Sequence, residues 1–242
     1  MNGAKLRARL QAGEPITMFT PHHASSGLSA RLVELGADSI FVDCEHGTWS
    51  FEDVRATSQI VRSAGGAAIV RPHSHERPVL IRYLNAGADG LMVPMVDTAE
   101  QARAIVDAVR YALPSDYEKR LVVSMIETLE AIDNLDEMLT VDGIDVFFIG
   151  PGDLSQNMGF PPAPPFGEPR PTEVVEKVAF AVEKIRAAGK VAGTLATAEE
   201  LPYWLGKGVQ FFYIHSDPFL RRGLAGIKTT FGRWSGKESD MK

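Results

Sequence analysis

The sequence alternates eight times between a short, largely apolar run and a longer segment, most of them helical in character. The runs are continuous rather than alternately apolar and polar, which is typical of strands buried on both faces of a parallel sheet. Glycine often marks the return from a helix-like segment to the next run, as expected for a helix C-terminus. The expected strands are 16–19, 39–42, 68–70, 90–93, 122–126, 146–149, 191–193 and 211–214, and the clearest expected helices are 27–35, 51–64, 77–86, 98–112, 172–188 and 220–225.

Eight such units in 242 residues fit a (β/α)8 (TIM) barrel. The competing open, doubly wound sheet usually carries Gly-x-Gly-x-x-Gly after its first strand, and this motif is missing. Because no break in composition or internal repeat divides the chain, we expect a single domain over residues 1–242. A stiff loop is expected at 161–171, which holds six of the 15 prolines; it is either a lid or a surface loop without a role.

Composition excludes several classes of protein. Lys and Arg number 25 against 31 Asp and Glu, a net charge of −6 that argues against a nucleic-acid partner. The single Cys excludes an internal disulfide framework and a zinc site with several Cys ligands. No run of about 18 apolar residues predicts a membrane span, and the first nine residues lack the apolar centre of a signal peptide. We therefore expect a cytoplasmic enzyme with no membrane partner.

The residues that follow the runs carry the expected chemistry, because the active site of such a barrel lies at the carboxyl ends of its strands. All six histidines fall on this face. Glu127 and Asp153 follow neighbouring runs, and carboxylate oxygens suit a divalent cation such as Mg²⁺ or Mn²⁺. Taken alone, Asp153 could cap a helix, and Glu127 could form an ion pair with an Arg. The presence of both carboxylates at the ends of neighbouring strands favours a metal site.

A second group of charged residues follows the second and third runs. Asp43 and His46 are three residues apart, a spacing that lets the carboxylate orient the imidazole as a general base. Glu45 either holds a metal-bound water or forms a salt bridge within the barrel. Arg71 ends an apolar run, where its guanidinium either binds a carboxylate or developing oxyanion or forms an internal ion pair.

Other polar positions give weaker signals. The stretch 150–155 offers bare backbone N–H groups before a helix start, which can receive a carboxylate. Cys44 has no base of its own and is interpreted as a small core residue rather than a nucleophile. Four histidines are interpreted as solvated loop residues or as lining of an entrance: His22, His23, His73 and His75. No Lys directly follows any of the eight runs, so no Schiff-base lysine is expected.

Five motifs in the same order resemble the class II, metal-dependent pyruvate aldolases of the HpcH/HpaI type. They lie at 41–47, 70–72, 87–96, 126–128 with 134–136, and 148–155 with 158–159. The chain departs from the family pattern at 110–120, which is shorter than usual, and at 73–76, where a Trp-containing stretch is replaced. These segments would shape the aldehyde end of the site and the subunit contacts, so the pyruvate half is the firmer part of the inference.

The resemblance implies a barrel of the phosphoenolpyruvate/pyruvate-binding type that requires Mg²⁺, Mn²⁺ or Co²⁺. It assigns the site residues as follows: Glu127 and Asp153 as metal ligands, Arg71 at the pyruvate oxygens, Asp43 and His46 as an acid/base dyad, Glu45 near a metal-bound water, and Pro151, Gly152 and Asp153 around the pyruvate carboxylate. It also implies a homo-oligomer, a trimer or a hexamer, in which the C-terminal helix is exchanged and residues 220–231 pack on a neighbour.

The implied reaction is reversible cleavage of a 4-hydroxy-2-oxo acid to pyruvate and an aldehyde through a metal-stabilised enolate. Two alternatives stay open. The same site could serve another enolate-forming lyase, acting on an acyl ester or a β-keto acid. The barrel could also be a non-catalytic metabolite-binding protein.

Overall fold

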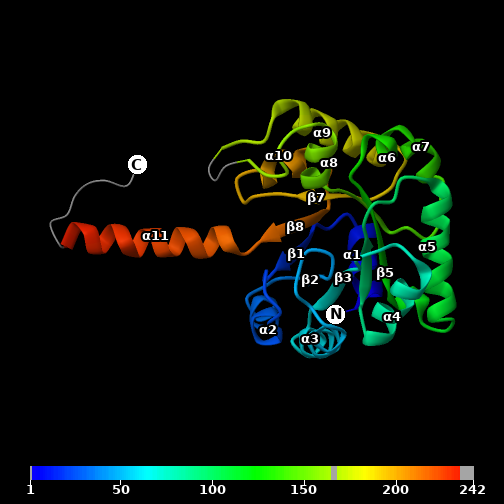
Figure 1. The fold of residues 1–242 in the computed structure, drawn as a ribbon, viewed down its shortest axis with the longest axis horizontal. Coiled ribbons are helices and arrows are strands. Elements are labelled where there is room, and N and C mark those ends of the chain that lie inside the picture. The colour runs from blue at the N-terminus through cyan, green and yellow to red at the C-terminus, as the bar shows by residue number, and fades with distance from the viewer. Residues whose placement is uncertain (1, 165–167, 235–242) are drawn as a thin grey trace.

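The computed structural model describes residues 2–164 and 168–234, and its centre is a closed barrel of eight parallel strands. Neighbours in the barrel follow chain order, and β8 closes it against β1 (Figure 1). The strands are β1 (Ile16–Thr20), β2 (Ser39–Asp43), β3 (Ala67–Arg71), β4 (Gly90–Val93), β5 (Leu121–Ile126), β6 (Val146–Ile149), β7 (Ala192–Leu195) and β8 (Phe211–His215). The predicted (β/α)8 barrel is confirmed, with ends shifted by one or two residues in six of the eight strands.

Helices surround this barrel on its outside, except for α1, which closes its amino end, and α11, which leaves it (Figure 1). They are α1 (Gly3–Gln11), α2 (Ser26–Glu34), α3 (Phe51–Ser63), α4 (Arg77–Ala86), α5 (Ala99–Ala112), the 3-10 turn η1 (Tyr117–Lys119), α6 (Leu129–Asp133), α7 (Leu135–Met138), α8 (Pro151–Asn157), α9 (Thr172–Ala187), α10 (Leu201–Gly206) and α11 (Asp217–Trp234). The six expected helices are present. The last of them is much longer than the expected 220–225.

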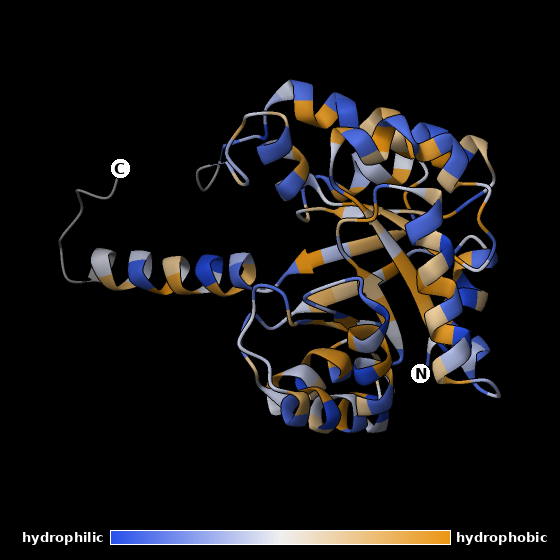
Figure 2. Ribbon diagram, turned by 45° about the vertical axis from the view of Figure 1, so that its right-hand side comes forward, coloured by the Kyte–Doolittle hydropathy of each residue, from blue (hydrophilic) through white to orange (hydrophobic). Residues whose placement is uncertain are grey.

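The apolar side chains form two layers. Strand residues that point inward fill the barrel, among them Met18, Phe41, Met125 and Phe148, while the alternate residues pack against the helices. Both faces of the strands are therefore apolar, which explains why the runs are continuous in sequence (Figure 2). Burial of this area is the main favourable contribution to folding.

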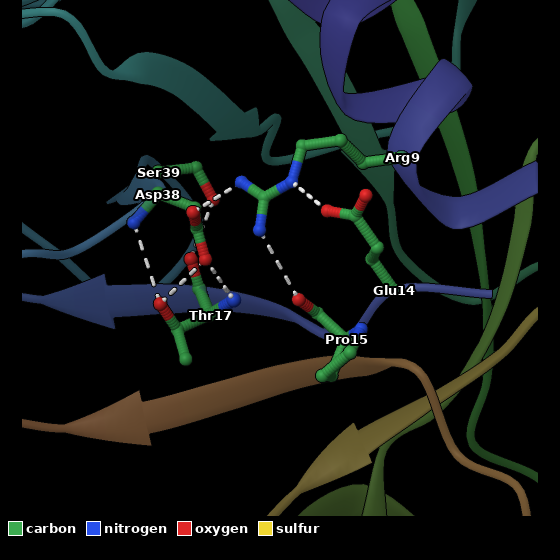
Figure 3. A network of polar contacts seen from close by, with 6 residues as sticks. All are labelled: Arg9, Glu14, Pro15, Thr17, Asp38 and Ser39. Atoms are coloured by element: carbon green, nitrogen blue, oxygen red, sulfur yellow. Dashed lines mark hydrogen bonds and ion pairs between the residues drawn. The ribbon is translucent and has the colours of Figure 1, made fainter. Parts of the chain in front are cut away.

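The amino end of the barrel is closed by α1 and by a polar network. Leu6 and Leu10 of α1 belong to the apolar layer inside the barrel. Arg9 pairs with Asp38, whose other oxygen accepts hydrogen bonds from the backbone N–H and hydroxyl of Thr17 at 2.9 and 3.0 Å (Figure 3). This network joins α1 to the starts of β1 and β2, so it stabilises the end of the barrel remote from the strand ends that carry function.

The helix α11 leaves the barrel instead of folding back on it (Figure 1). Five large apolar side chains on it are about half exposed or more: Phe219, Leu220, Leu224, Ile227 and Phe231. An exposed row of this kind marks an interaction surface. Within residues 2–164 and 168–234, no helix is both long and apolar enough to cross a bilayer.

Candidate active site

A cavity of about 500 Å³ opens at the carboxyl ends of the strands. All eight strands, or the loops that follow them, contribute residues to its wall. Its lining includes Thr20, His22, Phe41, Asp43, His46, Arg71, Glu127, Gly150, Pro151, Gly152, Asp153, Leu195, Tyr213 and His215. The structure therefore brings together every predicted site residue except Glu45, which is not part of this lining but contacts Arg71.

Glu127 lies at the end of β5 and is only 1% exposed. One carboxylate oxygen, Oε1, accepts a hydrogen bond of 2.9 Å from the backbone N–H of Met95, and Met95 has a φ of 53°. A left-handed backbone is rare for a residue other than glycine and is typical of functional sites. The other oxygen, Oε2, has no hydrogen-bond partner within the described residues. Burial, together with the negative charge of Asp153, raises the pKa of Glu127 to about 8.

The backbone of Gly150 keeps the space beside that oxygen open. A Cβ atom at position 150 would lie 2.5 Å from Oε2 of Glu127. Asp153, in the first turn of α8, interacts electrostatically with Glu127 and also faces the cavity. Two carboxylates side by side, one with an unpartnered buried oxygen, form a donor set that fits a hard divalent cation. No cluster of three or more His, Cys, Asp or Glu ligands occurs among the described residues, so water and substrate would complete the coordination.

Arg71, the last residue of β3, is held by two carboxylates at and just after the end of β2. Its Nε and Nη2 donate to Asp43 at 2.8 and 2.6 Å, and its Nη1 lies 3.1 Å from Glu45. Burial opposes the charged form of Arg71, but the hydrogen bonds that it donates to Asp43 and the nearby carboxylate charges outweigh this effect, so the pKa of Arg71 rises. Burial of Asp43 acts to raise its pKa, and the contact with Arg71 acts to lower it. The net result is a pKa of Asp43 below its ordinary value. The ion pair considered from the sequence is therefore present, and it also fixes the guanidinium at the cavity wall.

The predicted side-chain pair of Asp43 and His46 is not formed within the described residues. The Asp43 carboxylate accepts two hydrogen bonds from Arg71, and its Oδ1 also accepts the backbone N–H groups of Glu45 and His46 at 3.1 and 3.2 Å. The three-residue spacing produces a backbone turn rather than an imidazole contact. The imidazole of His46 is mostly exposed, and its Nε2 lies 3.9 Å from Glu45. Glu45 is thus the carboxylate near His46.

The start of α8 offers two free N–H groups. Gly150 is the N-cap without a side-chain hydrogen bond, and Pro151 occupies the first turn. The backbone N–H groups of Gly152 and Asp153 have no acceptor among the described residues. They are therefore available to an anionic group in the cavity.

Part of the proline-rich segment lies at the cavity edge. Pro162 belongs to the lining, and the Nη1 of Arg170 donates to the carbonyl oxygens of Pro151 and Pro162 and to the Ser155 hydroxyl, at 2.8 to 3.0 Å. Arg170 therefore fastens this segment to α8. The expected loop 161–171 includes residues 165–167, which lie outside the described residues.

The other histidines and Cys44 separate into lining and supporting residues. His22 and His215 line the cavity, whereas His23, His73 and His75 do not. His73 Nδ1 lies 3.1 Å from the Tyr83 hydroxyl, which also bonds Cys44. Burial raises the pKa of Cys44 to about 12, in agreement with its interpretation as a packed, unreactive residue.

Known proteins are similar in sequence to the chain over most of its length. Residues 16–213 match the sequence profile of the HpcH/HpaI aldolase/citrate lyase family. The 2-keto-3-deoxy-L-rhamnonate aldolase of Escherichia coli (strain K12) is 32% identical over 223 residues, which cover 81% of this chain and 82% of that protein.

Solved structures agree with this relationship. The citrate synthase SbnG is 26% identical, with a TM-score of 0.83 over 96% of this chain and 99% of that one. An HpcH/HpaI aldolase from Desulfitobacterium hafniense DCB-2 has the same fold, with a TM-score of 0.80 at 23% identity over 94% of this chain and 96% of that one. The chain thus belongs to the HpcH/HpaI aldolase/citrate lyase family and is an enzyme of the lyase type.

Proposed function

We propose that the protein is a divalent-metal-dependent aldolase that cleaves a 4-hydroxy-2-oxo acid to pyruvate and an aldehyde. The observation that carries this proposal is the unpartnered, buried Oε2 of Glu127 beside Asp153, at the end of the cavity that Arg71 also lines. Buried polar atoms are almost always satisfied, so a ligand that supplies positive charge is expected at this position.

Glu127 and Asp153 would hold the cation. When bound, a cation such as Mg²⁺, Mn²⁺ or Co²⁺ supplies a Lewis acid for the 2-oxo acid group of the substrate. Arg71 would bind the same group from the other side and stabilise the negative charge that develops on the 2-oxo oxygen. Its guanidinium is already oriented by Asp43 and Glu45, which contact all three of its nitrogen atoms. The N–H groups of Gly152 and Asp153 would receive the substrate carboxylate.

His46 is the proposed general base. In the cleavage direction the C4 hydroxyl proton passes to His46, directly or through a water, as the C3–C4 bond breaks and its electron pair moves toward C3 and the 2-oxo oxygen. The aldehyde leaves, and a proton delivered to C3 completes pyruvate. Glu45, 3.9 Å from the imidazole, would support its charged form.

The similarity to citrate synthase SbnG favours one alternative on the same site. In that reaction, C3 of the enolate formed from the 2-oxo acid would attack a carbonyl group other than that of an aldehyde. The pyruvate-binding half of the cavity would be unchanged, so the two reactions differ in the partner molecule.

An activity assay tests the proposal. A panel of 4-hydroxy-2-oxo acids is incubated with the protein, and pyruvate is measured with lactate dehydrogenase before EDTA, after EDTA, and after return of Mg²⁺, Mn²⁺ or Co²⁺. Metal-dependent pyruvate release is expected. Absence of release from a folded protein that still binds oxalate would favour the alternative electrophile, and absence of binding would contradict the aldolase proposal.

We also propose that the protein assembles through α11 as a trimer or hexamer. The apolar residues of α11, which are about half exposed or more within the described residues, would pack on a neighbouring copy.

A further inference from the structure

Two histidines form a joined pair on the side of the cavity opposite Glu127. In the closed barrel, β8 and β1 stand across from β4 and β5. His215 ends β8, His22 follows β1, and the Nδ1 of His215 lies 2.8 Å from the Nε2 of His22. Their rings are stacked, with centroids 4.7 Å apart. Both line the cavity.

The surrounding chain holds this pair in place. His22 has a φ of 60°, and its backbone N–H donates to the Thr20 hydroxyl at 3.2 Å. The Ser216 hydroxyl donates to the Thr20 carbonyl at 2.6 Å and so ties the ends of β8 and β1 together. The ring of Tyr213 lies 4.8 Å from that of His215. A strained backbone held by several contacts at a cavity wall indicates a functional position.

When both imidazoles are neutral, the single hydrogen bond between them fixes what the pair offers to a ligand. If His215 donates, the outer nitrogen of His22 carries a proton and that of His215 accepts; if His22 donates, the roles are reversed. In both tautomers the pair presents one donor and one acceptor. Neither outer nitrogen, Nδ1 of His22 or Nε2 of His215, has a hydrogen-bond partner among the described residues.

One donor and one acceptor match a hydroxyl group, which both donates and accepts. Other polar groups on this wall are already engaged: the hydroxyl groups of Thr20 and Tyr213 interact with each other. Burial and the neighbouring His22 lower the pKa of His215 to about 4, although Asp217 opposes this, so His215 is neutral at pH 7. A neutral His215 favours a neutral hydroxyl over a carboxylate.

We propose that His22 and His215 are specificity-determining residues that hold one hydroxyl group on the aldehyde fragment of the substrate. This inference rests on the proposed aldolase function. The 2-oxo acid end of the substrate would occupy the side of Glu127 and Arg71, so its remaining atoms would extend toward β8 and β1. The pair would therefore favour a 2-hydroxyaldehyde over the matching alkyl aldehyde.

The test compares two aldehydes that differ by one hydroxyl. Addition of pyruvate to lactaldehyde and to propanal is measured for wild type, His215→Phe and His22→Phe. In the variants, kcat/KM for lactaldehyde divided by kcat/KM for propanal is expected to fall by about 10- to 100-fold, as lost hydrogen bonds imply. His215→Asn keeps a donor and an acceptor near the Nδ1 position and should restore part of the ratio. His23→Phe, on an exposed neighbour outside the lining, is the control and should retain it.

A ratio that stays constant in His215→Phe and His22→Phe, with both aldehydes slowed equally, would overturn the inference and leave a structural role. Solvent deuterium exchange at the pyruvate methyl group, followed by NMR without any aldehyde, separates this from a failure of the proposed function. Exchange in wild type with a constant aldehyde ratio would overturn the histidine proposal alone. No exchange and no reaction with either aldehyde would overturn both.

Discussion

Asp43 and Arg71 are register partners in the β2–β3 pairing, and their side chains meet in two parallel hydrogen bonds of 2.8 and 2.6 Å. This geometry makes Asp43 a positioning residue for the guanidinium. The role differs from the orientation of His46 that the sequence spacing suggested.

Substitution of Asp43 should therefore act through Arg71. Asp43→Asn is expected to lower kcat/KM for aldol cleavage by about 100-fold, because a misplaced guanidinium loses its alignment with the substrate. In double-mutant cycles Asp43→Asn should be strongly non-additive with Arg71→Lys and close to additive with His46→Gln. Asp107→Asn, on the exposed face of α5, is the matched control. The reverse pattern of additivity would restore the Asp43–His46 dyad.

Glu127→Gln should increase stability and abolish metal binding. In EDTA at neutral pH, the variant is expected to raise the free energy of unfolding by about 1–3 kcal/mol, because burial raises the pKa of Glu127 to about 8 and folding must therefore protonate this carboxyl group or bury its charge. Wild type should be stabilised by added Mn²⁺, whereas the variant should not, because ligand binding to the native state shifts unfolding by mass action. Urea unfolding with and without metal measures both effects. Equal protection of wild type and Glu127→Gln would exclude Glu127 as a ligand, and Glu130→Gln, an exposed neighbour, controls for loss of charge.

The low pKa of His215 predicts a dependence of stability on pH. Burial and His22 give folded His215 a pKa of about 4, below the value of 6.5 expected when unfolded. The unfolded chain thus binds more protons between these values, and stability present above pH 6.5 is lost as the pH falls toward 4, by up to about 1.4 kcal/mol per pH unit. When the free energy of unfolding is measured with urea from pH 4.5 to 7.5, it should change less steeply with pH for His215→Asn than for wild type. His23→Asn should follow wild type, and an NMR titration of the His215 ring above pH 6 would contradict the assignment.

Assembly through α11 should depend on its apolar row. Leu224→Asp and Ile227→Asp are expected to convert the oligomer to smaller species, because each places a charge in an apolar contact. Sedimentation velocity measures the change. Lys228→Asp alters charge beside the row without removing an apolar side chain and should leave the oligomer intact. An unchanged sedimentation coefficient in both apolar variants would show that α11 is not the interface.

Much of the barrel could be predicted because its strands are buried on both sides and read as continuous apolar runs. The amino-terminal helix was not predicted, since only Leu6 and Leu10 of its nine residues carry the large apolar side chains that pack inside the barrel. The length of α11 was also missed, because Gly223 and Gly226 interrupt its apolar pattern.

For the site, the residues could be found from the sequence but their pairing could not. Glu127, Asp153 and Arg71 were recognisable because they follow strands. Arg71 pairs with Asp43 because of the register between β2 and β3, which the sequence does not show. His22 and His215 are 193 positions apart and meet only because β8 closes the barrel against β1.

The state of Cys44 has a practical consequence. It is the single Cys of the chain, and with a pKa of about 12 its thiol is almost entirely protonated at neutral pH, so alkylating dyes react with it slowly. A cysteine introduced at an exposed position of α11 would then be labelled selectively in the otherwise unaltered sequence. Fluorescence energy transfer between such labels would report how far apart the helices of two copies lie.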